Sequence, residues 1–202
     1  MQQLWVEKYR PQTVDGYVFV DEAQREQVDS WIKAGSIPHL LLSGAAGTGK
    51  TTLAKMLINE LGVDEYDVMY VNGSKEGRKI EWVDRLISFV QTMPFGRFKV
   101  VLIDEADYMN AQSIQPALRN FMETYSANCG FILTCNFVNK IIAPLHSRCS
   151  VIEFRILAAQ KPKLAGQFFK RVSKILQTEG IEFDQKVVAE MITKHFPDNR
   201  RI

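Results

Sequence analysis

The sequence has no long apolar run. No stretch of its 202 residues approaches the roughly 18 consecutive apolar residues of a membrane-spanning helix. The first residues mix charged and apolar side chains and lack the apolar core of a secretory signal. With 46% hydrophobic and 24% charged residues, the composition is that of a globular protein with a buried core. We therefore exclude membrane and disordered classes and expect a soluble protein of the cytoplasm.

Cysteine and net charge are also scarce. The three cysteines, Cys129, Cys135 and Cys149, are odd in number and lack the C-x-x-C spacing of a zinc or redox motif. They are predicted to be reduced structural thiols. Twenty-five basic against 23 acidic residues give a net charge of +2, which is too small to indicate a nucleic-acid binder by itself. Any such surface must arise from local placement.

The chain also lacks internal repeats and any Gly/Ser-rich or Pro-rich linker. Short apolar runs alternate with segments long enough for crossover helices, which predicts an α/β fold with a parallel five-stranded sheet between helices. The predicted strands are residues 40–43, 68–72, 99–103, 131–134 and 151–154. Two amphipathic helices, residues 163–178 and 185–196, follow the last strand. We predict a nucleotide-binding domain over residues 1–154 and a small helical domain over residues 155–202.

A glycine-rich stretch follows the first predicted strand. Residues 44–51 match G-x-x-x-x-G-K-[ST], the Walker A pattern, with a strand before it and a helix after it. The glycines let successive backbone N–H groups point at phosphate oxygens, and the helix N-terminus adds positive potential. Lys50 is then expected to reach the β and γ phosphates, and the Thr51 hydroxyl to hold Mg²⁺. The alternative is an ordinary glycine-rich turn, but the full pattern favours ATP with Mg²⁺.

Polar residues end two further strands of the predicted sheet. Asp104 and Glu105 follow the apolar run 99–103, where α/β sheets place their ligands. Asp104 is expected to hold the metal, usually through water, and Glu105 to polarise the attacking water. Asn136 follows residues 131–134 and is placed to hold the lytic water or the γ-phosphate. Alternatively, Glu105 is a surface carboxylate and Asn136 a turn residue.

Two arginines fit a phosphoryl-transfer site. Arg148 lies between the fourth and fifth strands, beyond easy reach of its own phosphate loop, and is a candidate finger acting in trans on a neighbouring subunit's nucleotide. Arg200, in the helical part, is placed to fold back on its own nucleotide. For each, the alternative is a solvated surface arginine.

These motifs occur together in a characteristic order. The chain resembles clamp-loader AAA+ ATPases of the replication factor C small-subunit type, and within them the ATPase subunits of T4-like phages. The resemblance covers nearly the whole chain. The phosphate-loop pattern occurs in many families, whereas the opening segment Leu4 to Pro11 and the Ser-Arg-Cys motif at residues 147–149 are narrow clamp-loader signatures. The segments that carry it are Leu4 to Pro11, Ile37 to His39, Gly44 to Thr51, Asp104 to Asp107, Phe121 to Ser126, Asn136, Ser147 to Cys149 and Phe196 to Arg201.

The resemblance implies roles for individual residues. The opening segment would close over the adenine, and the phosphate loop would hold the phosphates. Arg200 would be the lid arginine in cis and Arg148 the finger in trans. The implied nucleotide-binding residues are Glu7, Lys8, Tyr9, Arg10, Val18, Gly47, Thr48, Gly49, Lys50, Thr51, Thr52 and Arg200.

The resemblance also implies partners. Such a machine opens a ring-shaped sliding clamp and places it on primer-template DNA, in a hetero-pentamer with other clamp-loader subunits. Family members continue into a helical collar that holds the pentamer together. This chain stops at Ile202, inside the lid, so we expect a fragment or a form without its main assembly domain. No membrane partner is expected, and a phage origin would place it in the host cytoplasm.

Two surfaces are candidates for macromolecular contacts. The DNA surface, which is implied by the resemblance, uses the starts of two helices to hold the duplex backbone. The second helix is expected to begin near Asn110, and Pro116 would kink it unless it lies in the first turn. Alternatively, the basic cluster at residues 75–79 is a solvated turn. The candidate DNA residues are Lys75, Arg78, Lys79, Gln112, Ser113 and Arg119.

The second surface is an apolar cluster at residues 93–95, which meets the clamp in the family. Alternatively, Met93 and the preceding Phe89 are core residues of a helix.

Three other functions agree with parts of the sequence. In a P-loop small-molecule kinase, Arg148 and the opening segment Leu4 to Pro11 would have no role. A branch-migration helicase or replication initiator shares the hydrolysis residues but carries other remodelling elements. A nonhydrolysing scaffold subunit is disfavoured because the complete hydrolysis set is present.

Overall fold

The computed structural model describes residues 4–76 and 81–202, and within them a parallel sheet forms the centre of the molecule. The strand order is β2-β3-β4-β1-β5, and every paired neighbour is parallel. The expectation of a parallel five-stranded sheet is confirmed. The strands are β1 (Leu40–Ser43), β2 (Val68–Asn72), β3 (Lys99–Asp104), β4 (Cys129–Cys135) and β5 (Ser150–Glu153).

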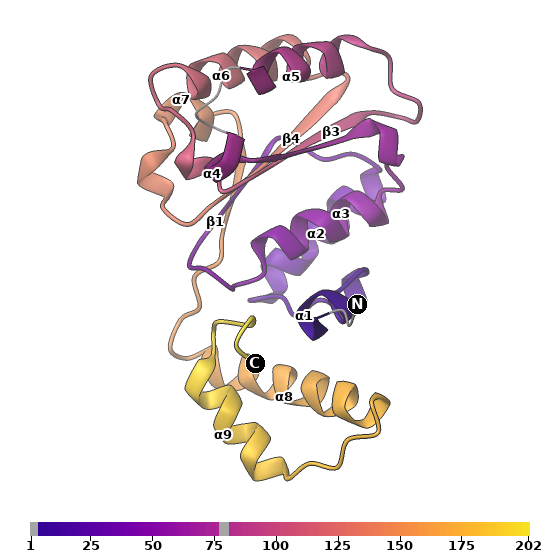
Figure 1. Cartoon of the computed structure of the whole chain (residues 1–202), viewed down its shortest axis with the longest axis vertical. Helices are drawn as coiled ribbons and strands as arrows, with labels where there is room; N and C mark the ends of the chain where they lie inside the picture. Colours follow the sequence, from indigo (N-terminus) through magenta and orange to yellow (C-terminus); the bar gives the residue numbers. More distant parts are fainter. Residues whose placement is uncertain (1–3, 77–80) are drawn as a thin grey trace.

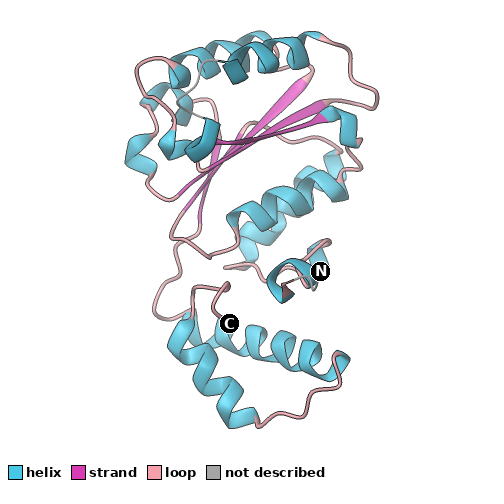
Figure 2. Ribbon diagram, viewed as in Figure 1, coloured by secondary structure: helices cyan, strands magenta, loops and turns pink. Residues whose placement is uncertain are grey.

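Helices cover both faces of the sheet, as Figures 1 and 2 show. One face carries α2 (Glu22–Ala34) and α3 (Lys50–Glu60), and the other carries α5 (Glu81–Gln91), α6 (Ile114–Thr124) and α7 (Ala143–His146). Short helical segments connect these layers. They are α1 (Trp5–Lys8), α4 (Gly73–Glu76) and the 3₁₀ turns η1 (Val14–Gly16), η2 (Glu65–Asp67), η3 (Ala106–Tyr108) and η4 (Val138–Lys140).

The alternating direction of the side chains along each strand explains why helices cover both faces of the sheet. In β1, Leu41 packs into the core under α5 and α6, whereas Leu40 and Leu42 pack into the core under α2 and α3. In β3, Val101 packs into the core under α5 and α6, and Val100 packs into the core under α2 and α3. Successive side chains of a strand point to opposite faces, so a strand that is apolar at every position needs cover on both sides.

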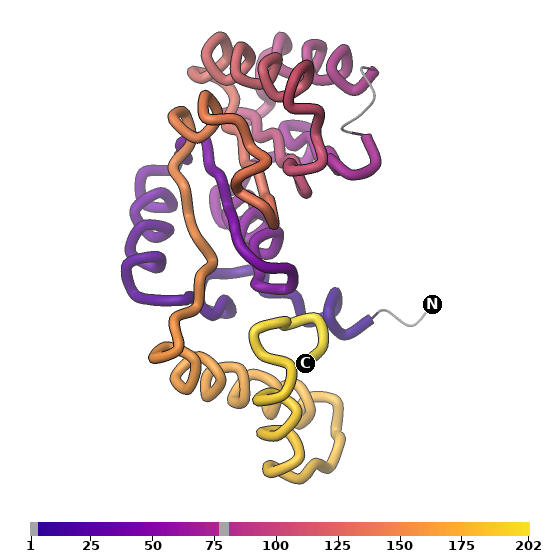
Figure 3. The backbone as a smooth tube through the Cα atoms, turned by 90° about the vertical axis from the view of Figure 1, so that its left-hand side faces the viewer, coloured from indigo at the N-terminus to yellow at the C-terminus, as the bar shows by residue number. Residues whose placement is uncertain are grey.

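The helical part follows β5. It consists of α8 (Lys161–Thr178) and α9 (Gln185–His195), which lie apart from the sheet at the other end of the molecule in Figure 1. We call α8, α9 and the residues up to 202 the lid. The tube in Figure 3 shows the C-terminal segment returning from α9 toward the sheet domain, near the N-terminal segment. The domain boundary at residue 154 stays a prediction.

Two further findings concern the apolar and sulfur-containing residues. Within the described residues, no helix is both long and apolar enough to cross a bilayer.

The three cysteines are free, and burial raises the pKa of each thiol to about 12. Protonated thiols are poor nucleophiles, so these residues have the structural character expected from the sequence.

Candidate functional site

The phosphate loop connects the end of β1 to the start of α3. Its backbone turns through Gly47 and Gly49, whose φ angles are 77° and 96°. A Cβ on Gly47 would lie 2.0 Å from Asp198 Oδ1 of the lid, and one on Gly49 would lie 2.9 Å from Tyr17 Oη. Both positions therefore need glycine for conformation and for space. The loop has the strand-turn-helix context that its sequence pattern predicts.

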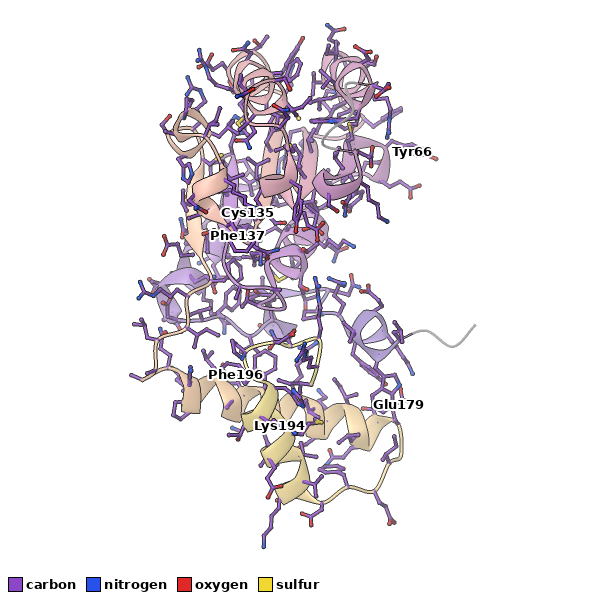
Figure 4. The ribbon with its side chains drawn as sticks, turned by 60° about the vertical axis from the view of Figure 1, so that its left-hand side comes forward. Tyr66, Cys135, Phe137, Glu179, Lys194 and Phe196 are labelled. Atoms are coloured by element: carbon purple, nitrogen blue, oxygen red, sulfur yellow. The ribbon has the colours of Figure 1, made fainter. Side chains whose placement is uncertain are left out.

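Lys50, the first residue of α3, is buried under this loop. Its ammonium group donates to the carbonyl oxygens of Gly44 at 2.8 Å and Ala45 at 2.7 Å, and to Asn136 Oδ1 at 3.0 Å. Burial lowers the pKa of Lys50. The structure thus brings the predicted Asn136 to the phosphate loop. Figure 4 labels Cys135, the last residue of β4, and Phe137, which flank Asn136 in the sequence.

Asp104 lies at the end of β3, opposite Thr51. Thr51 Oγ1 donates to Asp104 Oδ1 at 2.8 Å. A hydroxyl and a carboxylate oxygen at this separation are hard ligands of the kind that Mg²⁺ binds together with phosphate oxygens and water. The two predicted metal ligands are therefore adjacent, and their chemistry fits the ion.

Thr134 of β4 completes this group, although the sequence analysis missed it. Its hydroxyl donates to Asp104 Oδ1 at 2.5 Å and accepts from the backbone N–H of Glu105 at 3.1 Å. It is 1% exposed, and a polar residue in an otherwise apolar strand was the signal that could have found it. Thr134 orients both acidic residues of the predicted hydrolysis site.

Glu105 has an unusual backbone. Its φ of 57° makes it the non-glycine residue with positive φ among the described residues. Such a conformation is sparsely populated outside glycine and asparagine and is frequent at functional sites. The Glu105 carbonyl packs against Gly73, where an added Cβ would lie 2.4 Å away. The start of α4 is therefore in direct contact with the predicted general base.

A cavity of about 580 Å³ opens from the phosphate loop toward the lid. This volume lies within the range of small-molecule sites. Of the predicted nucleotide-binding residues, Glu7 and Lys8 do not line it; Glu7 pairs with Arg10, and Lys8 pairs with Glu179. Those on its wall are Tyr9, Arg10, Val18, Gly47, Thr48, Gly49, Lys50, Thr51, Thr52 and Arg200.

The lid reaches the phosphate loop directly. The backbone N–H of Asn199 donates to the Gly47 carbonyl at 3.1 Å. The positive charge of Arg200 contributes to the lowered pKa of Lys50, after burial, which is the larger cause. An anion between the two cations would be attracted to both. Arg200 lines the same cavity as Lys50, and its role in cis stays a prediction.

The sequence matches a protein-family model over residues 40–157. The model is that of the ATPase family associated with various cellular activities (AAA). The chain belongs to the AAA family. The match spans the sheet from β1 to the segment after β5 and includes Lys50, Asp104 and Asn136.

Relatives of this AAA chain include replication proteins. It is 42% identical over 200 residues to the sliding-clamp-loader large subunit of Enterobacteria phage T4, covering 96% of this chain and 61% of the relative. It is 38% identical to the replication factor C small subunit of Archaeoglobus fulgidus, covering 94% of this chain and 58% of that protein. The chain thus spans about three fifths of the length of these relatives.

A solved structure has the same fold. The Thermotoga maritima RuvB Holliday junction branch migration motor matches with a TM-score of 0.74 over 96% of this chain and 62% of that chain. At 20% identity, the likeness concerns the AAA fold alone.

Arg148 of this AAA domain lies outside the cavity. It follows α7, and its Nη1 donates to the Pro144 carbonyl at 2.7 Å, while its Nη2 pairs with Glu123 of α6. Arg119 Nε lies 3.7 Å from the same Glu123 oxygen. Arg148 is not among the residues that line the cavity of its own chain, and its role in trans stays a prediction.

Those predicted DNA residues that the structure describes lie on α4, in the turn before α6 and within α6. Lys75 is exposed and lies in α4, which precedes α5 in the sequence. At the start of α4, Asn72 Oδ1 accepts from the backbone N–H groups of Ser74 and Lys75. Arg78 and Lys79 lie outside the described residues.

The helix after the Asp-Glu motif also begins later than expected. Asn110 Oδ1 accepts from the N–H groups of Gln112 and Ser113, which forms a turn, and α6 starts at Ile114. Gln112 and Ser113 are exposed in this turn, and Arg119 lies within α6. Pro116 falls in the first turn of α6, where its missing N–H costs no helical hydrogen bond. The predicted kink therefore has no cause.

The predicted clamp cluster is partly a surface feature. Met93 is 81% and Phe95 80% exposed, whereas Phe89 packs against the core. The Phe95 ring lies 5.7 Å from that of Tyr66. The buried Asp67 accepts from the backbone N–H groups of Phe95 and Gly96, at 3.0 Å and 2.6 Å. A buried carboxylate therefore holds this apolar loop in an exposed position.

Proposed function

We propose that this chain is the ATPase subunit of a sliding-clamp loader, which uses ATP binding and hydrolysis to open the clamp and load it on primer-template DNA. The observation that carries the ATPase assignment is the hydrogen-bonded group of Lys50, Thr51, Asp104, Thr134 and Asn136 around one phosphate loop. Identity of 42% to the phage T4 clamp-loader large subunit supports the substrate and partners. The fold alone would suit a branch-migration motor equally well.

In this proposal, ATP occupies the cavity between the phosphate loop and the lid. Backbone N–H groups of residues 47–52 and the Lys50 ammonium bind the phosphates. Thr51 and Asp104 hold Mg²⁺, which when bound offsets the charge that develops on the phosphates. Glu105 accepts a proton from the attacking water, and Asn136 orients that water or the γ-phosphate.

Positive charge at the γ-phosphate comes from two arginines. Arg200 approaches from the lid of the same chain, and Arg148 from a neighbouring subunit. The neighbour's arginine is needed because the Arg148 of each chain lies outside its own cavity. Hydrolysis then depends on subunit alignment.

DNA contacts are assigned to the duplex backbone. Exposed Lys75, Gln112 and Ser113, together with Arg119, Arg78 and Lys79, are the proposed phosphate contacts. The contact between Gly73 of α4 and the Glu105 carbonyl supports a route by which DNA at Lys75 affects hydrolysis. The exposed loop with Met93 and Phe95 is the proposed clamp contact.

The test is ATP hydrolysis by this chain assembled with its companion subunits. Primer-template DNA and the clamp together should raise the rate about ten-fold or more, and either one alone should raise it less. Blunt duplex and a four-way junction are the control DNAs. Stimulation by neither clamp nor primer-template would contradict the clamp-loader proposal, and stimulation by the junction alone would favour a branch-migration motor.

A further inference from the structure

Residues 9–17, which we call the strap, join the N-terminal helix α1 to the sheet domain and form one side of the cavity. The strap is bound to α3 of the sheet domain at three points. Arg10 Nη1 donates to Thr52 Oγ1 at 3.1 Å, the Gln12 carbonyl accepts from Asn59 Nδ2 at 3.0 Å, and the Val14 N–H donates to Glu60 Oε1 at 2.9 Å. These contacts fix the strap along the helix that starts at Lys50.

The lid binds the same strap from the other side. Arg171 of α8 donates through Nη2 to the Tyr9 carbonyl at 2.7 Å and through Nη1 to the Gly16 carbonyl. At the end of α8, Glu179 accepts from Tyr9 Oη and pairs with Lys8 Nζ. Figure 4 shows Glu179 at this end of α8, beside the N-terminal segment. A single guanidinium group therefore holds both ends of the strap.

The surroundings of Arg171 are unusual for a charged group. Its side chain is half-buried, and within residues 4–76 and 81–202 it forms no ion pair. Burial lowers the pKa of Arg171. A partly desolvated cation with carbonyl partners is retained at a cost in solvation, which points to a use for its geometry or charge.

Arg171 also lies between two cavities. It lines the cavity of about 580 Å³ at the phosphate loop and a second groove of about 620 Å³ on the other side of the strap. Strap residues Tyr9 and Tyr17 form one wall of the first cavity, and lid residues such as Phe168 form the facing wall. Detaching the strap from Arg171 would separate these walls.

We propose that Arg171 is a positioning residue for nucleotide binding, which ties the strap to the lid so that both close over the nucleotide as one unit. The inference rests on the proposed ATP binding at this cavity. Arg171 acts through the Tyr9 and Gly16 carbonyls and not through the γ-phosphate. Its loss therefore weakens ATP binding and leaves the hydrolysis step at saturating ATP largely intact, because the groups around Lys50 belong to the sheet domain.

The test compares Arg171→Met with Lys170→Met, a matched loss of a cation from the neighbouring position of α8. Lys170 is exposed, and its side chain makes no hydrogen bond within the described residues. Arg171→Met should raise the Kd and KM for ATP about ten-fold, with kcat changed less than about two-fold. Lys170→Met should match the wild type. Arg171→Lys should lie between them, since it keeps the charge but loses the two-pronged geometry.

A second measurement separates positioning from a general effect on folding. In the wild type, ATP should slow hydrogen exchange of the peptide covering residues 9–17, and in Arg171→Met this protection should be lost. Equal ATP affinity and equal protection in Arg171→Met and wild type would overturn the inference. So would a fall in melting temperature of the same size with and without ATP. If the wild type fails to bind ATP, the proposed function is overturned, and this inference with it.

Discussion

At the residue scale, the ends of β3 and β4 determine how the candidate site is built. Asp104 Oδ1 accepts from two hydroxyl groups, those of Thr51 and Thr134. Thr134 also holds the N–H of Glu105, so one buried hydroxyl orients the proposed metal ligand and the proposed base. Positioning groups of this kind act on the chemistry through the residues they hold.

Glu105 is the residue whose replacement tests hydrolysis most directly. Glu105→Gln keeps the size of the side chain and removes its basicity, so ATP hydrolysis should fall about 10²- to 10⁴-fold while ATP affinity stays within about two-fold. Hydrolysis in the assembled complex and ATP binding at equilibrium are the two measurements.

The matched control is Glu153→Gln, which removes an exposed carboxylate at the end of β5. It should hydrolyse ATP at the wild-type rate. Hydrolysis by Glu105→Gln at the rate of this control would show that Glu105 is a surface carboxylate.

At the scale of elements, His39 joins three of them. It immediately precedes β1, its Nε2 lies 3.2 Å from the Met122 carbonyl of α6, and its Nδ1 accepts from the Phe131 N–H of β4 at 3.2 Å. A ring that accepts at Nδ1 and donates at Nε2 is neutral. Burial lowers the pKa of His39.

This geometry predicts a pH dependence of stability. The unfolded chain takes up a proton on His39 below pH about 6.5, whereas the folded chain resists it, so the free energy of unfolding should fall as the pH drops below that value. His39→Gln should make the fall shallower. Urea unfolding at pH 7.5 and 5.5 measures it.

His195→Gln is the control, since His195 ends α9 and its side chain makes no hydrogen bond within the described residues. Comparing the two variants separates the loss of the His39 contacts from the replacement of a histidine elsewhere in the chain. Parallel pH curves for His39→Gln and the wild type would mean that His39 is protonated equally in both states.

At the scale of the whole molecule, the proposed role of Arg148 in trans would relate this chain to neighbouring subunits. Glu123 holds it in the described structure, and Arg119 lies within 3.7 Å of the same carboxylate. In the proposed trans arrangement, Arg148 would turn toward a neighbour's nucleotide, and Arg119 would remain close enough to pair with Glu123. The proposed finger and one proposed DNA contact thus share one counter-charge.

Arg148→Ala should therefore suppress hydrolysis in the assembled complex about a hundred-fold or more, without weakening ATP binding by the isolated chain. Arg155→Ala, which removes an exposed arginine after β5, is the matched control and should have no effect. If the isolated Arg148→Ala chain loses ATP binding, the residue acts in cis or supports the fold.

The small net charge of +2 bears on how the proposed DNA contacts are made. Among the described residues proposed to contact DNA, the two cations are Lys75 of α4 and Arg119 of α6, so the positive charge of this surface is local. Several subunits acting together would then supply the phosphate contacts that one chain cannot.

The sequence by itself determined the features that depend on neighbouring residues. The strands 40–43 and 68–72 were predicted with their observed bounds, because an apolar run between turn residues is a local signal. The phosphate loop was equally local, since its turn, its glycines and Lys50 are contiguous. The start of α6 was predicted less accurately, because the Asn110 side chain forms a turn that delays the helix to Ile114.

Only the tertiary structure decided which distant groups meet. Thr134 reaches Asp104 because β3 and β4 are neighbours in the sheet, Glu123 reaches Arg148 because α6 packs against α7, and Arg171 reaches Tyr9 because the lid folds back on the N-terminal segment. These contacts join residues from 25 to 162 positions apart, and no local pattern encodes them. They arise from strand order and domain packing, which bury the apolar faces of the whole chain at once.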